Sequence, residues 1–161
     1  MYSDNMENKW VIFDLDGTIA DIEVRRNVCT NEDGKLDWDK FFDPKNIELD
    51  EPNEPVIEIL RKIAISGTKI IILSGRSDST QKVTEKWLSK YEVPYHILKM
   101  RPTSAKWKYM SDDKLKKYWL DEMFPGEKKY EIICTFDDRQ KVVDMWREEG
   151  LTCMQVAPGN F

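Results

Sequence analysis

The sequence predicts an α/β protein built on a doubly wound, mostly parallel sheet, with a small cap inserted after the first strand. Short apolar runs alternate with amphipathic stretches of helical length, and this alternation implies right-handed βαβ crossovers. Residues 21–52 interrupt the alternation with a long charged segment. Because 161 residues is the length of one domain with a substantial core, we expect a single domain over residues 1–161.

The first half of the chain contains two predicted strands separated by a predicted helix. Residues 10–13 (Trp-Val-Ile-Phe) form an apolar run that predicts the first strand. Residues 54–65 place apolar side chains on one broad face, which predicts a helix that ends at Gly67. Residues 69–73 are rich in isoleucine, as is typical of a strand buried on both faces.

The second half continues the same alternation. Helices are expected at residues 78–90, 112–123 and 139–149. Strands are expected at residues 95–98, 130–136 and 151–156. Pro125 and Gly126 stop the second of these helices, and Gly150 ends the third.

Residues 21–52 fit neither the strand nor the helix pattern. The segment is charged and carries two neighbouring aromatic residues, Phe41 and Phe42. A connection of this length inside a compact domain is usually functional. We therefore expect it to form a small lid or cap.

Composition limits the classes of function. No stretch approaches a membrane span, and residues 1–9 are too polar for a signal peptide, so we expect a cytoplasmic protein. A net charge of −5 argues against a surface that coats nucleic acid, but it is compatible with a site for a strand end or a small phosphate ester. The three cysteines share no metal-ligand spacing, and buried thiols are expected.

An acidic motif directly follows the first predicted strand. Asp14 and Asp16 are two residues apart, and Gly17 and Thr18 come next. Strand alternation turns Leu15 to one side and both carboxylates to the other. Converging carboxylates repel each other unless a cation lies between them, and Mg²⁺ prefers oxygen ligands. The motif therefore predicts a metal site with one carboxylate free to attack phosphorus; the alternative is a turn that closes the strand.

Polar residues also follow two other predicted strands. Ser74, Gly75 and Arg76 follow the second strand, and residues 137–139 (Asp-Asp-Arg) follow the fourth. In open parallel sheets, ligands bind beyond the carboxyl ends of the strands. A hydroxyl, an unhindered N–H and a guanidinium suit a phosphate group, although a plain turn and a helix cap would use the same residues. Because polar residues of this kind follow three of the predicted strands, the sequence favours a site for a phosphate and a metal ion.

One predicted helix carries the cation that such a site needs. The helix at residues 112–123 contains Lys114, Lys116 and Lys117. Most lysines on a helix are solvated. A site with four carboxylates, however, requires a positive charge besides the metal to keep the nucleophile ionised.

These motifs together resemble those of the haloacid dehalogenase superfamily. The resemblance rests on residues 14–18 (Asp-Leu-Asp-Gly-Thr), Ser74, a helical lysine and the pair Asp137 and Asp138. Residues 136–139, 142–147, 155–157 and 159–161 are also similar to the carboxyl-terminal 3′-phosphatase domain of bacteriophage polynucleotide kinase, and the likeness covers nearly the whole chain. No kinase-type Gly-x-x-x-x-Gly-Lys-Ser/Thr loop occurs in the sequence. The resemblance therefore implies a freestanding phosphatase with a Rossmann-like sheet.

The resemblance also implies a catalytic set and a magnesium site. Asp14 would be the nucleophile that becomes an aspartyl-phosphate, and Asp16 the acid and then the base. Ser74 would bind the transferring phosphoryl group. Lys116, four residues after Asp112, matches the motif lysine. The implied Mg²⁺ ligands are Asp14, Asp16 (also through its backbone carbonyl), Asp137 and Asp138.

Five residues are expected to bind substrate. Arg25 and Arg76 match family arginines that contact substrate, and Asp112 matches a residue that the family also uses. Gly75 belongs to the predicted phosphate cradle. Arg101 lies where basic and aromatic residues interleave, as they do in sites for single-stranded nucleic acid; a packed surface loop is the alternative.

The expected activity is Mg²⁺-dependent removal of 3′-phosphates from polynucleotide ends or 3′-nucleotides. Asp16 favours a phosphatase over a dehalogenase, because the alkoxide of a phosphate ester leaves poorly without a proton. One alternative is a nucleotidase acting on free mononucleotides, and another is a non-catalytic module that binds a phosphorylated ligand. The expected partners are the phosphorylated nucleotide or polynucleotide end and a separate kinase or ligase.

Overall fold

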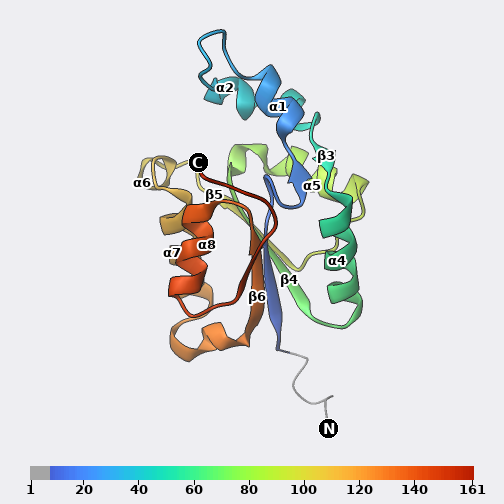
Figure 1. The fold of residues 1–161 in the computed structure, drawn as a ribbon, viewed down its shortest axis with the longest axis vertical. Coiled ribbons are helices and arrows are strands. Elements are labelled where there is room, and N and C mark those ends of the chain that lie inside the picture. Colours follow the sequence, from blue (N-terminus) through green and yellow to red (C-terminus); the bar gives the residue numbers. More distant parts are fainter. Residues whose placement is uncertain (1–7) are drawn as a thin grey trace.

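A five-stranded parallel sheet forms the centre of the computed structural model, which describes residues 8–161 (Figure 1). The strand order is β5-β4-β1-β6-β7, so the first strand of the chain lies in the middle. Every neighbouring pair is parallel. The strands are β1 (Trp10–Asp14), β4 (Lys69–Ser77), β5 (Ile97–Arg101), β6 (Ile132–Asp137) and β7 (Cys153–Gln155).

Helices cover both faces of this sheet and create two cores. Alternation along β1 sends Val11 and Phe13 into one core and Ile12 into the other. The first core lies under α4 and α5, and the second under α7 and α8 (Figure 1). These helices are α4 (Glu54–Ile65), α5 (Gln81–Lys90), α7 (Asp112–Met123) and α8 (Gln140–Glu148). The predicted doubly wound α/β fold is thereby confirmed.

Two strands end three or four residues later than the sequence predicts. β4 continues through residues 74–76, which were expected to follow it, and β5 continues to Arg101 instead of ending at residue 98. Ser74 pairs with Met100, whereas Ser77 pairs with Arg101, so the register shifts between the two positions. Gly75 and residue 76 thus form a bulge, which keeps the strand paired while it bends at the sheet edge.

The insertion, residues 22–50, is a small helical unit beyond the carboxyl ends of the strands (Figure 1). The short antiparallel strands β2 (Ala20–Asp21) and β3 (Glu51–Pro52) join it to the sheet domain. Its helices are α1 (Glu23–Val28), α2 (Trp38–Phe41) and α3 (Pro44–Ile47). The other short helices are η1 (Asp78–Thr80), α6 (Ala105–Lys108) and η2 (Gly126–Glu131).

Two further expectations concern composition. In the part of the chain that the structure describes, no helix has the length and apolar character needed to cross a membrane. The expected lack of a signal peptide depends on residues 1–9, most of which lie outside the described range. Cys29, Cys134 and Cys153 are free and buried, and burial was the prediction for Cys134 and Cys153.

Candidate active site

The carboxyl ends of β1, β4 and β6 open into a cleft of about 870 Å³ below the insertion. Its floor includes Asp14 at the end of β1, Asp137 at the end of β6, and Lys116 from α7. One wall comes from the insertion and another from the segment between β5 and α7. The fold thus brings together acidic and basic side chains that lie far apart in the sequence.

Lys116 bridges two aspartates at the floor of the cleft. Its Nζ lies 2.8 Å from Asp14 Oδ1 and 2.9 Å from Asp137 Oδ2. The hydroxyl of Thr18 donates a hydrogen bond to the other Asp14 oxygen at 3.2 Å. Both oxygens of the candidate nucleophile therefore have defined partners, and its carboxylate is held in one orientation.

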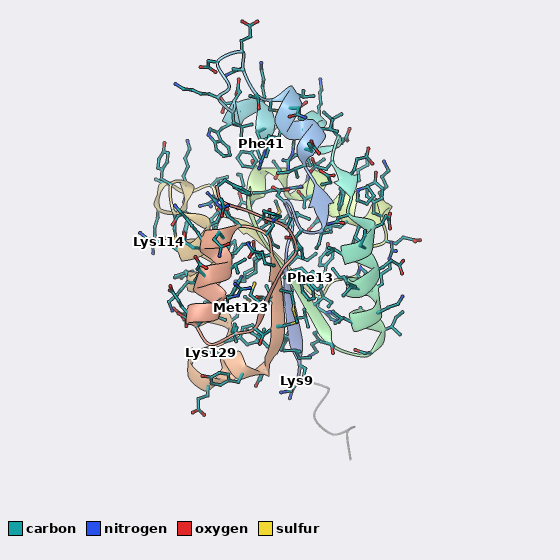
Figure 2. All side chains as sticks on the ribbon, viewed as in Figure 1. Lys9, Phe13, Phe41, Lys114, Met123 and Lys129 are labelled. Carbon is teal, nitrogen blue, oxygen red and sulfur yellow. The ribbon has the colours of Figure 1, made fainter. Side chains whose placement is uncertain are left out.

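The position of Lys116 on α7 explains why it is the lysine that enters the site. Asp112 lies four residues earlier, so both residues are on the same helix face. Lys116 is buried, whereas Lys114 is exposed and lies on the outer side of α7 (Figure 2). Lys117 pairs with Asp121 at 3.1 Å on the helix surface.

Asp14, Asp137 and Asp138 form an acidic cluster that fits a divalent cation. Each offers one carboxylate oxygen, and these oxygens lie within 4.8 Å of one another. The residues are buried, and the ammonium of Lys116 offsets only one of their charges. Gly17 makes the approach possible, because it adopts φ +83° and a Cβ there would overlap the Asp138 carboxylate. Several oxygen donors with excess negative charge are the ligands that Mg²⁺ prefers.

The ionisation behaviour of this cluster agrees with a need for a cation. Burial, followed by the charge of Asp137, raises the pKa of Asp14 well above its ordinary value of 3.8. Burial also raises the pKa of Asp138. For Lys116, burial acts to lower the pKa, but Asp137 and Asp14 outweigh it and raise the pKa above 10.5. The lysine stays charged, and a bound cation would allow Asp14 to ionise.

Asp16 lies in the same cleft but outside the acidic cluster. Its Oδ1 accepts hydrogen bonds from Arg25 Nη2 at 2.8 Å and from Arg76 Nε at 2.9 Å. Burial acts to raise the pKa of Asp16, but the charges of Arg76 and Arg25 lower it to about 2. The two guanidinium groups therefore keep the side chain of Asp16 apart from that of Asp14. A metal-binding role for its backbone carbonyl stays a prediction.

Arg25 and Arg76 are themselves fully buried. Arg25 Nη1 donates to the backbone oxygen of Phe41 at 3.1 Å, and Arg76 Nη1 donates to the hydroxyl of Thr84 at 3.1 Å. In this arrangement the two guanidinium groups orient Asp16. Direct contact with substrate, which the resemblance implies for both, stays a prediction.

Asp50 completes this network, and sequence reasoning missed it. Its carboxylate oxygens lie 3.0 Å from Arg25 Nε and 2.7 Å from Arg76 Nη2. Burial raises the pKa of Asp50 to about 7 against the opposing charges of Arg25 and Arg76. The indole of Trp87 donates to its backbone oxygen at 3.0 Å. No motif surrounds Asp50 in the sequence, and only the fold shows that the end of the insertion returns to the site.

The bulge of β4 places Ser74 and Gly75 at the edge of the site. The Ser74 hydroxyl oxygen accepts a hydrogen bond from the backbone N–H of Arg76 at 3.1 Å. Gly75 lines the cleft, and a Cβ at this position would lie 2.6 Å from Asp112 Oδ1. A side chain at this position would therefore have to displace the Asp112 carboxylate. Phosphate binding by Ser74 and Gly75 stays a prediction.

Asp112 joins two arginines in the wall of the cleft. Its Oδ1 lies 2.5 Å from Arg101 Nη2, and its Oδ2 lies 2.9 Å from Arg139 Nη1. Arg101 also donates to the backbone oxygens of Gly75, Trp107 and Met110. The guanidinium of Arg101 therefore ties the segment after β5 to the bulge of β4. Contact of Arg101 and Asp112 with substrate stays a prediction.

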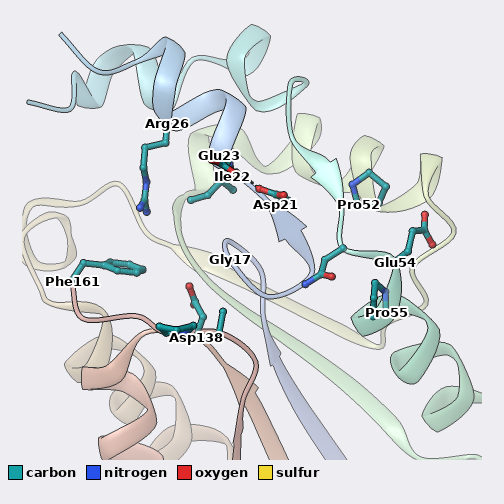
Figure 3. A pocket seen from close by; sticks show the side chains of 13 residues that line it. Gly17, Asp21, Ile22, Glu23, Arg26, Pro52, Glu54, Pro55, Asp138 and Phe161 are labelled. Atoms are coloured by element: carbon teal, nitrogen blue, oxygen red, sulfur yellow. Dashed lines mark hydrogen bonds between the residues drawn. The ribbon is translucent and has the colours of Figure 1, made fainter. Parts of the chain in front are cut away.

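A smaller pocket of about 540 Å³ adjoins the cleft and shares Ile22, Arg26, Asp138 and Phe161 with it (Figure 3). Arg26 reaches down from α1 to the ring of Phe161, with its guanidinium carbon 5.0 Å from the ring centroid. Arg139 contacts the same ring at 5.4 Å. The carboxyl-terminal segment thus forms part of the boundary between the two spaces.

A parallel α/β sheet with an acidic cluster at the tip of its central strand is the fold of haloacid dehalogenase-type hydrolases. A hydrolase of this superfamily from Geobacter sulfurreducens superimposes with a TM-score of 0.59, over 91% of this chain and 86% of that chain. Its sequence is 14% identical, so this similarity concerns the fold alone.

The particular family follows from the sequence match. Residues 8–161 match the family described as the polynucleotide kinase PNKP phosphatase domain. The chain belongs to this family, and the expected resemblance is confirmed.

Two further relatives agree with this assignment. A chain in the structure of the Pnkp1/Rnl/Hen1 RNA repair complex is 36% identical and superimposes with a TM-score of 0.74 over 95% of this chain. A protein of Autographa californica nuclear polyhedrosis virus, named as a bifunctional polynucleotide kinase/RNA ligase, is 34% identical over 144 residues, or 86% of this chain. The present chain spans 43% of the first relative and 18% of the second.

Proposed function

We propose that the chain is a Mg²⁺-dependent phosphomonoesterase that removes 3′-phosphates from polynucleotide ends through an aspartyl-phosphate intermediate. The observation that carries this proposal is the placement of Asp14. Its carboxylate is buried at the floor of an open cleft, 2.8 Å from Lys116 and clustered with Asp137 and Asp138. Membership of the phosphatase-domain family supports the same reaction.

In the first step, a carboxylate oxygen of Asp14 attacks phosphorus and the bond from phosphorus to the ester oxygen breaks. Asp16 protonates the departing oxygen. In the second step, Asp16 takes a proton from water, which attacks phosphorus and releases inorganic phosphate and free Asp14. Lys116 offsets negative charge on Asp14 and on the phosphoryl group in both steps.

Asp16 must carry a proton when the leaving group departs. Arg76 and Arg25 lower its pKa to about 2 in the free protein. A phosphate dianion in the cleft adds negative charge close to Asp16 and competes for the same guanidinium groups, and both effects raise the pKa of a carboxyl group. We therefore expect Asp16 to gain its proton with the substrate and to be ionised again when it activates water.

Asp14, Asp137 and Asp138 would hold the magnesium ion, together with the backbone carbonyl of Asp16. When bound, Mg²⁺ would neutralise charge on the phosphoryl oxygens and on the carboxylate cluster. The insertion acts as a cap that covers the cleft, and the whole chain forms one domain.

The relatives support a nucleic-acid end as substrate and a separate kinase or ligase as partner. One relative is named as a polynucleotide kinase and RNA ligase, and another belongs to an RNA repair complex. Removal of a 3′-phosphate leaves a 3′-hydroxyl, which a ligase can use. We therefore propose that the chain prepares strand ends for such an enzyme.

A panel of 3′- and 5′-phosphorylated oligonucleotides and mononucleotides tests the proposal, with kcat/KM as the readout. The expected result is the highest value for the 3′-phosphorylated oligonucleotide, with loss of turnover in EDTA and recovery in Mg²⁺. Higher values for mononucleotides would identify a nucleotidase. A folded protein that binds Mg²⁺ but turns over no phosphate ester would be a non-catalytic binding module.

A further inference from the structure

The insertion carries an aromatic cluster, formed by Trp38, Phe41 and Phe42, that plays no part in the proposed chemistry. Phe41 is buried on the side of the insertion that faces the sheet domain (Figure 2), and its ring lies 4.1 Å from the guanidinium carbon of Arg25. The ring of Trp38 stacks on Phe42 at 5.9 Å and meets the Phe41 ring edge-on at 5.7 Å. Trp38 is nevertheless 61% exposed. The cluster therefore presents a large aromatic ring to solvent.

All three rings line the same cleft as Asp14. The segment between β5 and α7 contributes Tyr109, which is 85% exposed and has the ammonium of Lys108 at 5.6 Å from its ring. Trp107 is different, because its ring packs against Tyr118 at 4.6 Å and against the core under α7. Trp38 and Tyr109 are therefore exposed rings in the walls of the space that the substrate must enter.

Positive side chains accompany these rings. Arg26, Lys108 and Arg139 line the cleft, although Asp39 lies there too and the whole chain has a net charge of −5. Cationic groups next to exposed aromatic rings are typical of sites for single-stranded nucleic acid, where the rings stack on bases and the cations follow the phosphates. A protein partner would not need this cluster inside the cleft that holds the reacting carboxylate.

We infer that Trp38, with Tyr109 on the segment after β5, forms a subsite for the nucleobases next to the terminal phosphate of a single strand. This inference rests on the proposed function and specifies its substrate as an unpaired strand end. The exposed ring of Trp38 stacks on a base, while Lys108 and Arg139 neutralise backbone phosphates. Bases inside a duplex are already stacked on their neighbours and do not offer a free face to this ring.

The test compares two strands that carry the same 3′-phosphate, one with all its bases and one without bases in its last two nucleotides. For the complete strand, Trp38→Ala should raise KM by about 5- to 160-fold with little change in kcat, the range typical of one lost base–aromatic stack. For the strand without terminal bases, the same variant should behave like the wild type. Trp38→Phe keeps an aromatic ring and should recover part of the loss.

Tyr130→Ala is the matched control, because Tyr130 is 60% exposed but lies outside the cleft, in η2. Tyr109→Ala, measured on the same pair of strands, provides an independent variant at the second ring. Equal effects of Trp38→Ala on the two strands, or no effect on either, would overturn the inference while leaving the proposed function intact. Failure of the wild type to hydrolyse either strand while it hydrolyses a small phosphate ester would instead overturn the proposed function.

Discussion

The carboxylate of Asp16 is held by two buried guanidinium groups, and this pairing determines how the fold responds to acid. Arg76 and Arg25 keep the pKa of Asp16 near 2, below the 3.8 of an unperturbed aspartate. The ionised carboxylate therefore stabilises the folded state above about pH 4, and this contribution is lost as the pH falls through about 2.

Asp16→Asn should accordingly destabilise the metal-free protein by about 2 kcal/mol at neutral pH, because each pKa unit corresponds to about 1.4 kcal/mol. The difference in the free energy of unfolding between the variant and the wild type should shrink as the pH falls through about 2, because the wild-type carboxyl then becomes neutral too. Urea unfolding of both proteins at a series of pH values measures this difference in the free energy of unfolding. A difference that does not change with pH would contradict the ion pairing.

Asp50 provides a second prediction at the scale of single residues. Asp50→Ala should lower kcat by up to about 100-fold, because Arg25 and Arg76 would no longer hold Asp16 in place. Burial raises the pKa of Asp50 to about 7, so the neutral Asp50→Asn should recover most of the activity by accepting the hydrogen bond from Arg76.

Steady-state kinetics on a phosphate ester that lacks a nucleobase measures the change in kcat. This substrate separates the effect on catalysis from any effect on nucleobase binding. Asp33→Ala, at an exposed position of the same insertion, is the control. An unchanged kcat in Asp50→Ala would show that the two arginines keep their positions without it.

Lys116 and Asp50 show which residues of the site could be predicted. The resemblance picked out Lys116, because its spacing from Asp112 along one helix is visible in the sequence. Asp50 bonds to Arg76, which lies 26 residues away in another element. No local sequence pattern indicates a contact over this separation, so the role of Asp50 in the site could not be predicted from the sequence.

At the scale of elements, helix bounds were easier to predict than strand ends. The helices at residues 54–65 and 112–123 have the predicted bounds, because their apolar periodicity and the residues that stop them are local features. The end of β4 depends on its pairing with β5 and on the bulge between Ser74 and Ser77. That pairing is a tertiary contact, and the predicted strands therefore ended too early.

Arg101 links β4 and β5 to the segment that follows β5. This position leads to a prediction for that segment. Arg101→Ala should reduce kcat/KM for an oligonucleotide and for a small phosphate ester to a similar extent. The reason is that its guanidinium bonds to three backbone oxygens and to Asp112. Parallel kinetics with the two substrates checks this. A loss confined to the oligonucleotide would show instead that Arg101 binds the strand directly.

For the whole molecule, alternation of strand and helix signals was sufficient to predict the doubly wound parallel sheet. The length of residues 21–52 predicts a cap, but the helices inside it could not be predicted, because the segment has no regular apolar period. Its position depends on buried contacts such as those of Arg25 with Asp16 and Asp50. The same contacts hold the insertion against the candidate active site.

Capture of the phosphorylated protein tests the central claim most directly. Wild-type protein mixed with excess 3′-phosphorylated oligonucleotide and Mg²⁺, and quenched in acid during turnover, should yield a phosphorylated peptide that contains Asp14 by mass spectrometry. Asp14→Asn should be folded, inactive and free of this modification. An active wild type that never carries the phosphoryl group, or an Asp14→Asn variant that retains near-normal turnover, would contradict the account.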